Sequence, residues 1–217
     1  EHKVTKIITK DNSVESVDII DNKSSKKNVK YDIVISTAPY QVLDKLIDLD
    51  QNIKSSMDKV EYMSAIVMIL TLNNSLSEYY WLSIAENNFP FLGIIEHTNL
   101  IPKENYADNN ILYITNYVEN DNKLLKYSYE ELIDIYTPYL KKINNKFDKD
   151  WILEHKFNKI NYAQPIIPVN YSKIIIPLKL SIKGLYSGNT AQIYPEDRGT
   201  NYAVDIGNKI TNLIIKS

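Results

Sequence analysis

GLYSGNTAQIYPEDRGTNYAVDIGNKITNLI, residues 184–214, holds four of the five glycines of the 217-residue chain and its only arginine, Arg198. Residues 185–187 have the apolar character of a short buried strand, and Gly188 permits a tight turn directly after it. From Thr200 to Ile215, apolar side chains recur at helical spacing. The stretch therefore predicts a strand, a glycine turn and a C-terminal helix.

The junction of this turn and this helix could bind a ligand. A helix start offers free backbone amides and a partial positive charge, which suit an anionic or electron-rich ligand edge. Small residues at Ala203 and Gly207, one turn apart, would let a neighbour approach the helix closely. One face of the helix is expected to carry Ala203, Ile206, Gly207, Ile210, Leu213 and Ile214. Spacing alone equally allows a plain helix docked on a sheet, with the glycines as ordinary turn residues.

The amino-terminal part predicts strands that lead into a helix. Two alternating runs, residues 4–9 and 14–20, form a hairpin across Asp11 and Asn12, and the polar stretch at residues 21–28 is expected to be a surface loop. In YDIVISTAPYQVLDKLI, residues 31–47, the run Ile33–Ile35 indicates a strand covered on both faces. Ser36 and Thr37 are expected to cap a helix that begins at Pro39.

The middle of the chain has an antiparallel character. Residues 62–72, 79–86, 89–98 and 110–119 have the patterns of strands, and residues 151–169 return to strand and extended structure. Ser128 and Glu131 form a capping box at the start of a helix. Trp81 and Trp151 are expected in the core of this region. The predicted fold class is thus α/β at both chain ends around an α+β middle.

Composition excludes several classes of function. The net charge is −2 and the pI about 6.0, which argues against a nucleic-acid partner. The chain has no cysteine and three scattered histidines, His2, His97 and His155, so no metal site is expected. No apolar run is long enough to span a membrane and no signal peptide opens the sequence, so we expect a cytoplasmic protein. Because EHKVTKIITK, residues 1–10, already reads as a strand, we also expect a piece cut from a longer chain.

Residues 184–210 resemble the C-terminal flavin-binding signature of the FAD-dependent amine oxidase superfamily. The sequence of this motif is most similar to that of protoporphyrinogen-oxidase-like and phytoene-desaturase-like oxidoreductases. Residues 31–47 resemble the strand with which this family re-enters its FAD domain, and residues 2–19 resemble the strand hairpin before it. The middle of the chain is more loosely similar to the family's substrate domain.

The family's opening βαβ unit, with its G-x-G-x-x-G motif, has no counterpart in the sequence. The resemblance therefore implies the C-terminal portion of such an enzyme, a remnant of a discontinuous FAD-binding domain with an inserted substrate domain. It places FAD-domain segments at residues 1–40 and 181–217 and a substrate-binding domain, built on a mainly antiparallel sheet, at residues 41–180. FAD would belong to the intact protein. The chain alone is expected to lack FAD as purified, to keep at best a weak flavin site, and to be inactive.

The resemblance also implies the residues that would contact the cofactor. Gly188 and Asn189 align with the turn near the ribityl and phosphate part of FAD, where the family often has an acid. The helix start aligns with amides near the flavin pyrimidine edge. Arg198 would serve the flavin or an acidic substrate, or else pair at the surface with Glu196 or Asp197. The full predicted set is Gly188, Asn189, Arg198, Gly199, Asn201, Tyr202, Ala203 and Val204; no catalytic residue is identified.

The implied function is hydride transfer from a small-molecule substrate to FAD in the intact enzyme, the oxidised bond being carbon–nitrogen or carbon–carbon. Two alternatives remain. A flavin-dependent sugar-nucleotide mutase is a non-redox relative, but its diphosphate substrate calls for several arginines and the chain has one. A binding module that has lost FAD is the other. A sheet edge left bare at residues 32–36 would invite self-association, so a homodimer is also expected.

Overall fold

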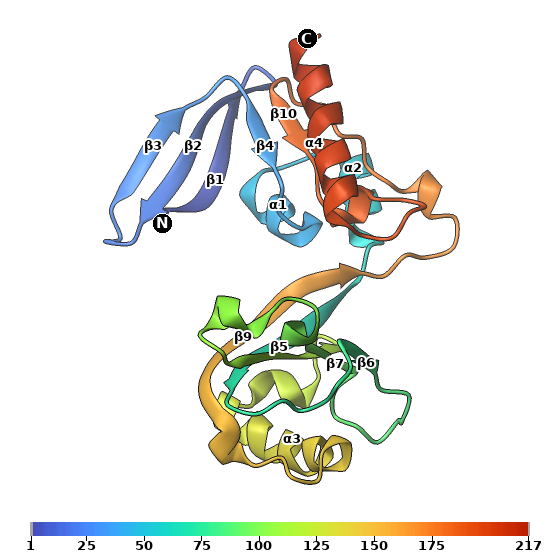
Figure 1. Cartoon of the computed structure of the whole chain (residues 1–217). Helices are drawn as coiled ribbons and strands as arrows, with labels where there is room; N and C mark the ends of the chain where they lie inside the picture. Colours follow the sequence, from blue (N-terminus) through green and yellow to red (C-terminus); the bar gives the residue numbers. More distant parts are fainter. Residues whose placement is uncertain (1, 217) are drawn as a thin grey trace. The chain divides into compact units, whose positions relative to one another are not determined.

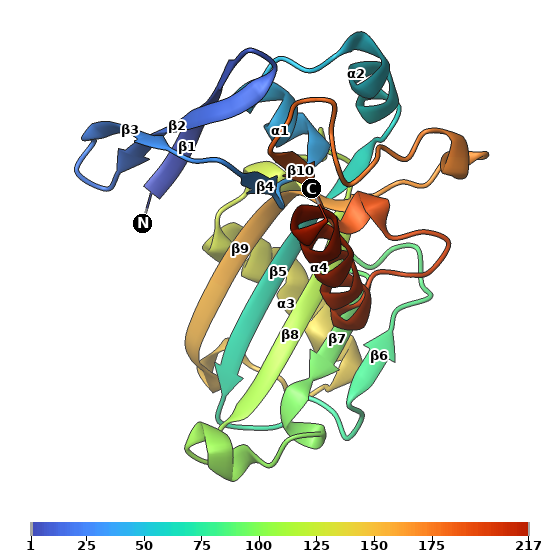
Figure 2. The ribbon, with the colours of Figure 1, turned by 90° about the horizontal axis from the view of Figure 1, so that it is seen from above.

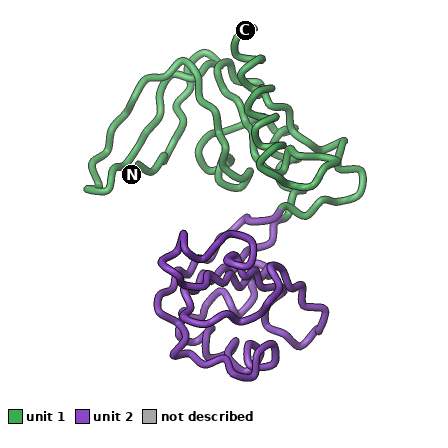
Figure 3. Tube along the Cα trace, in the orientation of Figure 1, with its two compact units in different colours: residues 1–61, 165–217 green, residues 62–164 purple. Residues whose placement is uncertain are grey.

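The computed structural model describes residues 2–216, which divide into two compact units (Figures 1 and 3). Unit 1 comprises residues 1–61 and 165–217, and unit 2 comprises residues 62–164. The sequence predicts boundaries at 40/41 and 180/181, whereas the units divide at 61/62 and 164/165. Residues 41–61 are tied to unit 1, because Gln41 donates to the Val60 carbonyl (2.8 Å) and Ser181 donates to Asp50 (2.7 Å). Residues 165–180 are tied to it through Tyr171, whose hydroxyl donates to the Ala191 carbonyl.

Unit 1 contains both ends of the described chain. Its strands and α-helices are β1 (His2–Lys10), β2 (Ser13–Asp21), β3 (Lys26–Lys30), β4 (Val34–Ser36), α1 (Tyr40–Leu46), α2 (Gln51–Asp58), β10 (Leu185–Ser187) and α4 (Thr200–Ile215). Short 3-10 turns occur at η5 (Tyr171–Lys173) and η6 (Thr190–Gln192). Strands β1, β2 and β3 form an antiparallel meander, and β10 and β4 form a separate parallel pair (Figure 1).

The parallel pair joins segments about 150 residues apart in sequence. Val34, Ile35 and Ser36 lie opposite Leu185, Tyr186 and Ser187. Helix α4 packs on β10 through a cluster of Tyr186, Ile193, Ile206 and Ile210. The expected packing of the two chain ends into one unit, with parallel strands, is therefore confirmed.

Gly184 lies directly before β10, at a position that only glycine can occupy. It has φ +80°, and a Cβ atom there would lie 2.3 Å from the Asp32 carbonyl oxygen. Both the left-handed backbone and the close approach require glycine. The β1–β2 turn is fixed nearby, since Val14 donates to the Lys183 carbonyl and Lys183 donates to that of Asn12, both at 2.9 Å. Asp11 and Asn12 have positive φ, as the predicted hairpin turn requires.

Unit 2 is an antiparallel sheet with one covering helix. It contains β5 (Tyr62–Leu72), β6 (Trp81–Ser83), β7 (Gly93–Glu96), β8 (Asn110–Val118), α3 (Tyr129–Ile143) and β9 (Ile152–Pro165), with 3-10 turns η1 (His97–Asn99), η2 (Lys103–Tyr106), η3 (Lys123–Lys126) and η4 (Lys149–Trp151). The strand order is β6-β7-β8-β5-β9 (Figure 2). The fold is thus a mixed α/β arrangement with a five-stranded antiparallel sheet.

The core of unit 2 lies between this sheet and α3. Ile66, Met68, Leu70 and Leu72 point from alternate positions of β5 into the same cluster as Leu132 and Tyr136 of α3. The predicted capping box is present: the Ser128 hydroxyl accepts from the Glu131 amide, and the Glu131 carboxylate accepts from the Ser128 amide.

Four sequence expectations are wrong. Residues 26–28 lie in β3, because pairing with β2 organises a polar segment that has no apolar pattern of its own. Ile33 and Ile35 are 41% and 47% exposed, since α4 covers β10 and leaves β4 bare. Helix α1 has Pro39 as its N-cap and no side-chain cap. Trp81 is 57% exposed on an edge strand.

Candidate functional site

A cavity of about 270 Å³ lies in unit 1 where β4 and β10 end and α4 begins. The carboxyl ends of neighbouring parallel strands meet at one edge of a sheet, which is the usual ligand-binding edge of α/β folds. The β4–α1 connection, the β10–α4 connection and helix α4 line this cavity, and each contributes uncharged residues. The lining residues are Thr37, Pro39, Gly188, Asn189, Thr190, Ile193, Ala203 and Ile206.

Gly188 allows α4 to pack against the end of β10. A Cβ atom at Gly188 would lie 2.5 Å from Ile210 Cδ1 and 2.8 Å from Ile206 Cγ2. Its amide donates to the Ser36 carbonyl at 2.9 Å, so it extends the β10–β4 ladder by one bond. The absence of a side chain therefore brings the first turns of the helix next to the strand ends.

Asn189 ties the two strand ends together. Its Oδ1 accepts from the Ala191 amide (2.9 Å), and its backbone amide donates to Gln192 Oε1 (3.0 Å), which makes a capping box for η6. Its Nδ2 donates to the Ala38 carbonyl in the β4–α1 connection (3.1 Å). Both Oδ1 and Nδ2 of Asn189 thus bond within the protein, and these bonds shape the wall of the cavity.

Tyr171 holds η6, the short helix that Asn189 caps, in place. Its buried hydroxyl donates to the Ala191 carbonyl in η6. Burial raises the pKa of Tyr171 to about 12. The phenol therefore stays protonated, and stays a donor, over the whole physiological range.

Helix α4 lines the cavity with Ala203 and Ile206, and its first turn has no side-chain cap. Gly199 is the N-cap residue, in extended conformation. The first-turn amides of a helix have no partner within the helix, so α4 offers donors and the positive end of its dipole at this position. Ala203 and Val204 are exposed, whereas Tyr202 packs against the cluster around Tyr186.

Three of the eight predicted cofactor-binding residues line the cavity: Gly188, Asn189 and Ala203. The other five, Arg198, Gly199, Asn201, Tyr202 and Val204, belong to the loop and first turn of α4 beside it. The sequence reasoning missed Thr37, Pro39, Thr190, Ile193 and Ile206. Thr37 and Pro39 could have been found, because they directly follow a strand predicted to run parallel to β10.

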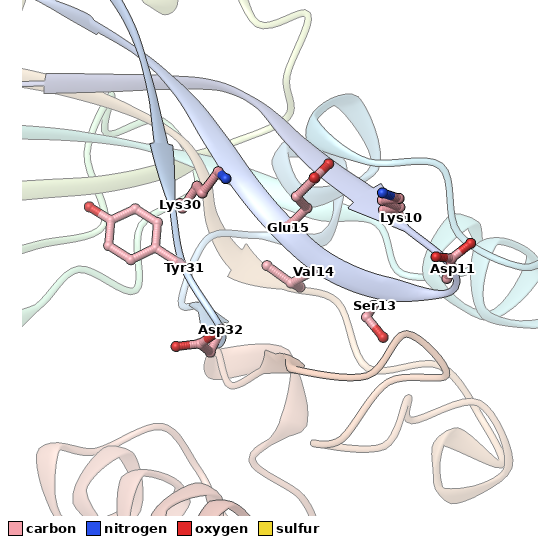
Figure 4. Close-up of a pocket in the computed structure, with 8 residues that line it drawn as sticks. All are labelled: Lys10, Asp11, Ser13, Val14, Glu15, Lys30, Tyr31 and Asp32. Carbon is pink, nitrogen blue, oxygen red and sulfur yellow. The ribbon is translucent and has the colours of Figure 1, made fainter.

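A second hollow of unit 1, about 460 Å³, has a different character. Its labelled side chains come from the turn of the β1–β2 hairpin and from the segment between the end of β3 and β4 (Figure 4). It contains Asp32, so it adjoins the amino end of β4, and it mixes lysines with carboxylates. Neither its position nor its mixed charge matches the ligand-binding edge of a parallel sheet.

One face of the unit 2 sheet carries an apolar and aromatic row. The strand registers place Trp81 opposite Ile95, Ile95 opposite Tyr113, and Tyr113 opposite Ile69. These residues alternate with those that pack beneath α3, so the row lies on the other face of the sheet. The neighbouring row, Ser83, Gly93, Thr115 and Val67, is also uncharged. This face is therefore suited to an uncharged ligand.

Glu96, at the end of β7, is the buried carboxylate of unit 2. Its oxygens accept from the amides of Leu76 (3.0 Å) and Ser77 (2.7 Å). Burial raises the pKa of Glu96 above its ordinary value, and these hydrogen bonds oppose the rise. Both carboxylate oxygens thus accept hydrogen bonds that fix the β5–β6 connection, which gives Glu96 a structural role.

Among residues 2–216, no group of three or more His, Asp or Glu side chains could hold a metal ion. None of the helices described there is long and apolar enough to cross a membrane.

The fold is similar to that of several solved structures. A putative protoporphyrinogen oxidase from Exiguobacterium sp. 255-15 matches 100% of the chain with a TM-score of 0.67 and 12% identity. A reduced UDP-galactopyranose mutase matches 99% with a TM-score of 0.69 and 16% identity. An oxidoreductase from Methanosarcina mazei matches 87% with a TM-score of 0.61 and 16% identity. The chain therefore shares the fold of these proteins, as the resemblance implies.

The chain spans about half the length of these proteins, since the matches cover 43%, 47% and 47% of their chains. No protein-family model matches the sequence, and none of the curated proteins matches it either. At sequence identities of 12–16%, these matches show a shared fold and do not show the activity.

Proposed function

We propose that the chain is the C-terminal part of an FAD-dependent oxidoreductase, in which unit 1 holds the flavin side of the cofactor and unit 2 carries the substrate surface. The observation behind this proposal is the cavity at the carboxyl ends of β4 and β10, which α4 lines with Ala203 and Ile206. The structural matches over 87–100% of the chain support it. FAD would supply the hydride acceptor.

The residues of the cavity suit an electron-rich ring edge. Gly188 presents no side chain, so a ligand can approach the backbone there. The first-turn amides of α4 would donate to a polar ring edge, and the helix dipole would stabilise negative charge on it. Thr37 adds a hydroxyl from the opposite wall. Arg198, just before the helix, is positioned in sequence to add positive charge.

The substrate would meet the apolar row on unit 2. Trp81 and Tyr113 offer flat aromatic surfaces, and neither this row nor the neighbouring row contains a charged side chain. This favours an uncharged, apolar substrate for an oxidoreductase. It argues against a sugar diphosphate, whose phosphates need cationic partners.

A flavin-dependent mutase is the second candidate, because a UDP-galactopyranose mutase matches 99% of the chain with a TM-score of 0.69. The single arginine weighs against it. A test is to titrate the Trp151→Phe variant, in which Trp81 is the single tryptophan, with UDP-galactose and, separately, with an uncharged aromatic ligand, and to follow the tryptophan fluorescence. Quenching by UDP-galactose alone would favour the mutase.

The flavin proposal is tested by two substitutions on α4. Ala203 lines the cavity, whereas Ile215, at the other end of the helix and 77% exposed, does not. Ala203→Leu should fill the cavity and weaken FAD binding at least about tenfold, while Ile215→Leu should leave it unchanged. Binding is followed by the quenching of flavin fluorescence as protein is added. Equal effects of the two variants, or no quenching at millimolar protein, would refute the proposal.

A further inference from the structure

The β1–β3 meander of unit 1 gathers lysines on one of its two faces. Residues that lie opposite one another on neighbouring strands share a face of the sheet, and alternate residues of one strand do so too. The rows that meet both conditions on this face are Lys3–Ile20–Lys26, Lys6–Asp18–Asn28 and Ile8–Ser16–Lys30. The four lysines of these rows are exposed, and we call them the lysine face.

A hydrogen-bond network in the middle of this face shows that the rows lie together. Asn28 Nδ2 donates to Ser16 Oγ (2.9 Å) and to Asp18 Oδ1 (2.7 Å). The single carboxylate of the three rows thus has an uncharged partner. Within residues 2–216, the ion pairs of the structure involve none of the four lysines. The lysine face therefore presents four ammonium groups whose charge no carboxylate of the described chain neutralises at close range.

Protection of the sheet edges does not account for this arrangement. Strands β1 and β3 are the outer strands of the meander (Figure 1), and lysines on outer strands discourage edge-to-edge pairing. That role is independent of the face on which a lysine lies. The opposite face carries the rows Val4–Ile19–Lys27 and Ile7–Val17–Val29, four residues of which line an apolar groove beside α1. The lysines are thus concentrated on the face turned away from this groove.

The charge pattern favours a polypeptide partner over a lipid bilayer or a nucleic acid. Both of those present closely spaced negative charge, which would also meet the Asp18 carboxylate in the middle of the face. Residues 2–30 contain seven lysines and four acidic residues, but the whole chain has a net charge of −2, so its long-range attraction to a polyanion is weak. A polypeptide can place carboxylates opposite the lysines and an uncharged residue opposite Asp18.

The spacing of the lysines suits an extended acidic segment. Neighbouring strands lie about 4.8 Å apart, so the backbones of Lys3 and Lys26, on the two outer strands, are roughly 10 Å apart. In the polyproline II conformation, every third side chain points to the same side at intervals of about 9 Å. An acidic residue at every third position would therefore reach lysines on both outer strands.

We propose that the lysine face is a docking surface for an acidic, extended segment of a partner protein, whose carboxylates pair with lysines on both sides of Asp18. The inference rests on the strand registers, the Asn28 network and the missing ion pairs. It is independent of the flavin cavity and would hold if that cavity bound no flavin.

The test is a titration of the ¹⁵N-labelled chain with the probe acetyl-Glu-Pro-Pro-Glu-Pro-Pro-Glu-amide. Backbone amide signals are followed at about 20 mM and about 200 mM NaCl. We expect the signals of the four lysines and of Asn28 to shift, with binding at least about fivefold weaker at the higher salt concentration. A control peptide with glutamine in place of each glutamate should shift none of them.

Two fourfold variants with the same loss of charge locate the binding. One replaces the lysine face by Lys3→Gln, Lys6→Gln, Lys26→Gln and Lys30→Gln. The control replaces four exposed lysines of unit 2 that the ion pairs of the described chain do not involve: Lys103, Lys123, Lys126 and Lys146.

The first variant should bind the probe at least about fivefold more weakly than the control variant at the lower salt concentration. If the first variant unfolds, Lys3→Gln combined with Lys26→Gln serves instead, because it removes the two lysines of one row. Its control is then Lys123→Gln combined with Lys126→Gln.

Three results would overturn the inference. One is the absence of shifts with millimolar probe at the lower salt concentration. Another is an equal loss of binding in both fourfold variants. The third is binding to phosphatidylserine vesicles or to a DNA duplex, at the same salt concentration, that the first variant loses and the control keeps. The partner would then be a lipid surface or a nucleic acid.

Discussion

The Asn189 side chain donates to the Ala38 carbonyl across 3.1 Å, and this bond joins loops that follow two strands more than 140 residues apart in the sequence. The same side chain caps η6. One residue therefore holds together both walls of the cavity at which we place the flavin. Stability and site geometry should consequently respond together when it is changed.

Asn189→Ala should destabilise unit 1 by about 1–3 kcal/mol, because it removes a cap and an inter-loop hydrogen bond. Asn122 is a matched control: its side chain accepts from the Leu124 amide to cap η3, and no further bond of it is seen in the described structure. Asn122→Ala should cost only about 0.5–2 kcal/mol. Urea unfolding of both variants measures the difference. A larger loss for Asn122→Ala would contradict the tying role of Asn189.

Gly188→Ala should destabilise the chain by roughly 1–3 kcal/mol, because its Cβ atom would crowd Ile210 and Ile206. Gly207→Ala is the control on the same helix. A Cβ atom there meets nothing within 4 Å, so this change should stabilise by up to about 1 kcal/mol. The two substitutions should thus change the free energy of unfolding in opposite directions. The double variant Gly188→Ala with Ile210→Val should recover part of the loss, as contacting residues couple.

Glu96 should make unit 2 less stable as pH rises. Burial raises the pKa of its carboxyl in the folded state, so the folded protein binds the proton more tightly than the unfolded one. Its contribution is then fully present at pH below the ordinary value of 4.5 and is lost as pH rises through the raised folded pKa. Glu96→Gln should remove this slope.

Urea unfolding at about pH 4.5 and about pH 7 tests the role of Glu96, with the wild type and Glu96→Gln compared at each pH. The comparison cancels the other titrating groups, which both proteins share. The wild type should lose more stability than the variant over this interval. A steeper loss in Glu96→Gln would show that the hydrogen bonds to Leu76 and Ser77 outweigh the burial of the charge.

The sequence predicted the elements whose chemistry is local. The alternation in residues 4–20 indicated the β1–β2 hairpin, and the apolar runs at 33–35 and 185–187 indicated the parallel pair. The capping box at Ser128 needed only four residues to recognise. The resemblance added the order of these parts and the approximate position of the site.

The sequence failed where a neighbouring segment decides the outcome. Residues 26–28 are polar, and only pairing with β2 makes them a strand. Ile35 looks like a core residue, yet no segment of the described chain covers it. Half of the cavity lining, such as Ile193 and Ile206, is set by how η6 and α4 pack, and the packing angle cannot be read from helical spacing.

Our proposal assigns one half of FAD, the flavin, to this chain. We place the flavin in the cavity lined by Gly188, Asn189 and Ala203, and the sequence has no G-x-G-x-x-G motif for the pyrophosphate and adenosine. The ¹⁵N-labelled chain should therefore be titrated with riboflavin and, separately, with ADP. Riboflavin should shift the amide signals of Gly188, Asn189 and Ala203, while ADP leaves them unmoved. Shifts with ADP alone, or with neither compound, would contradict the central claim.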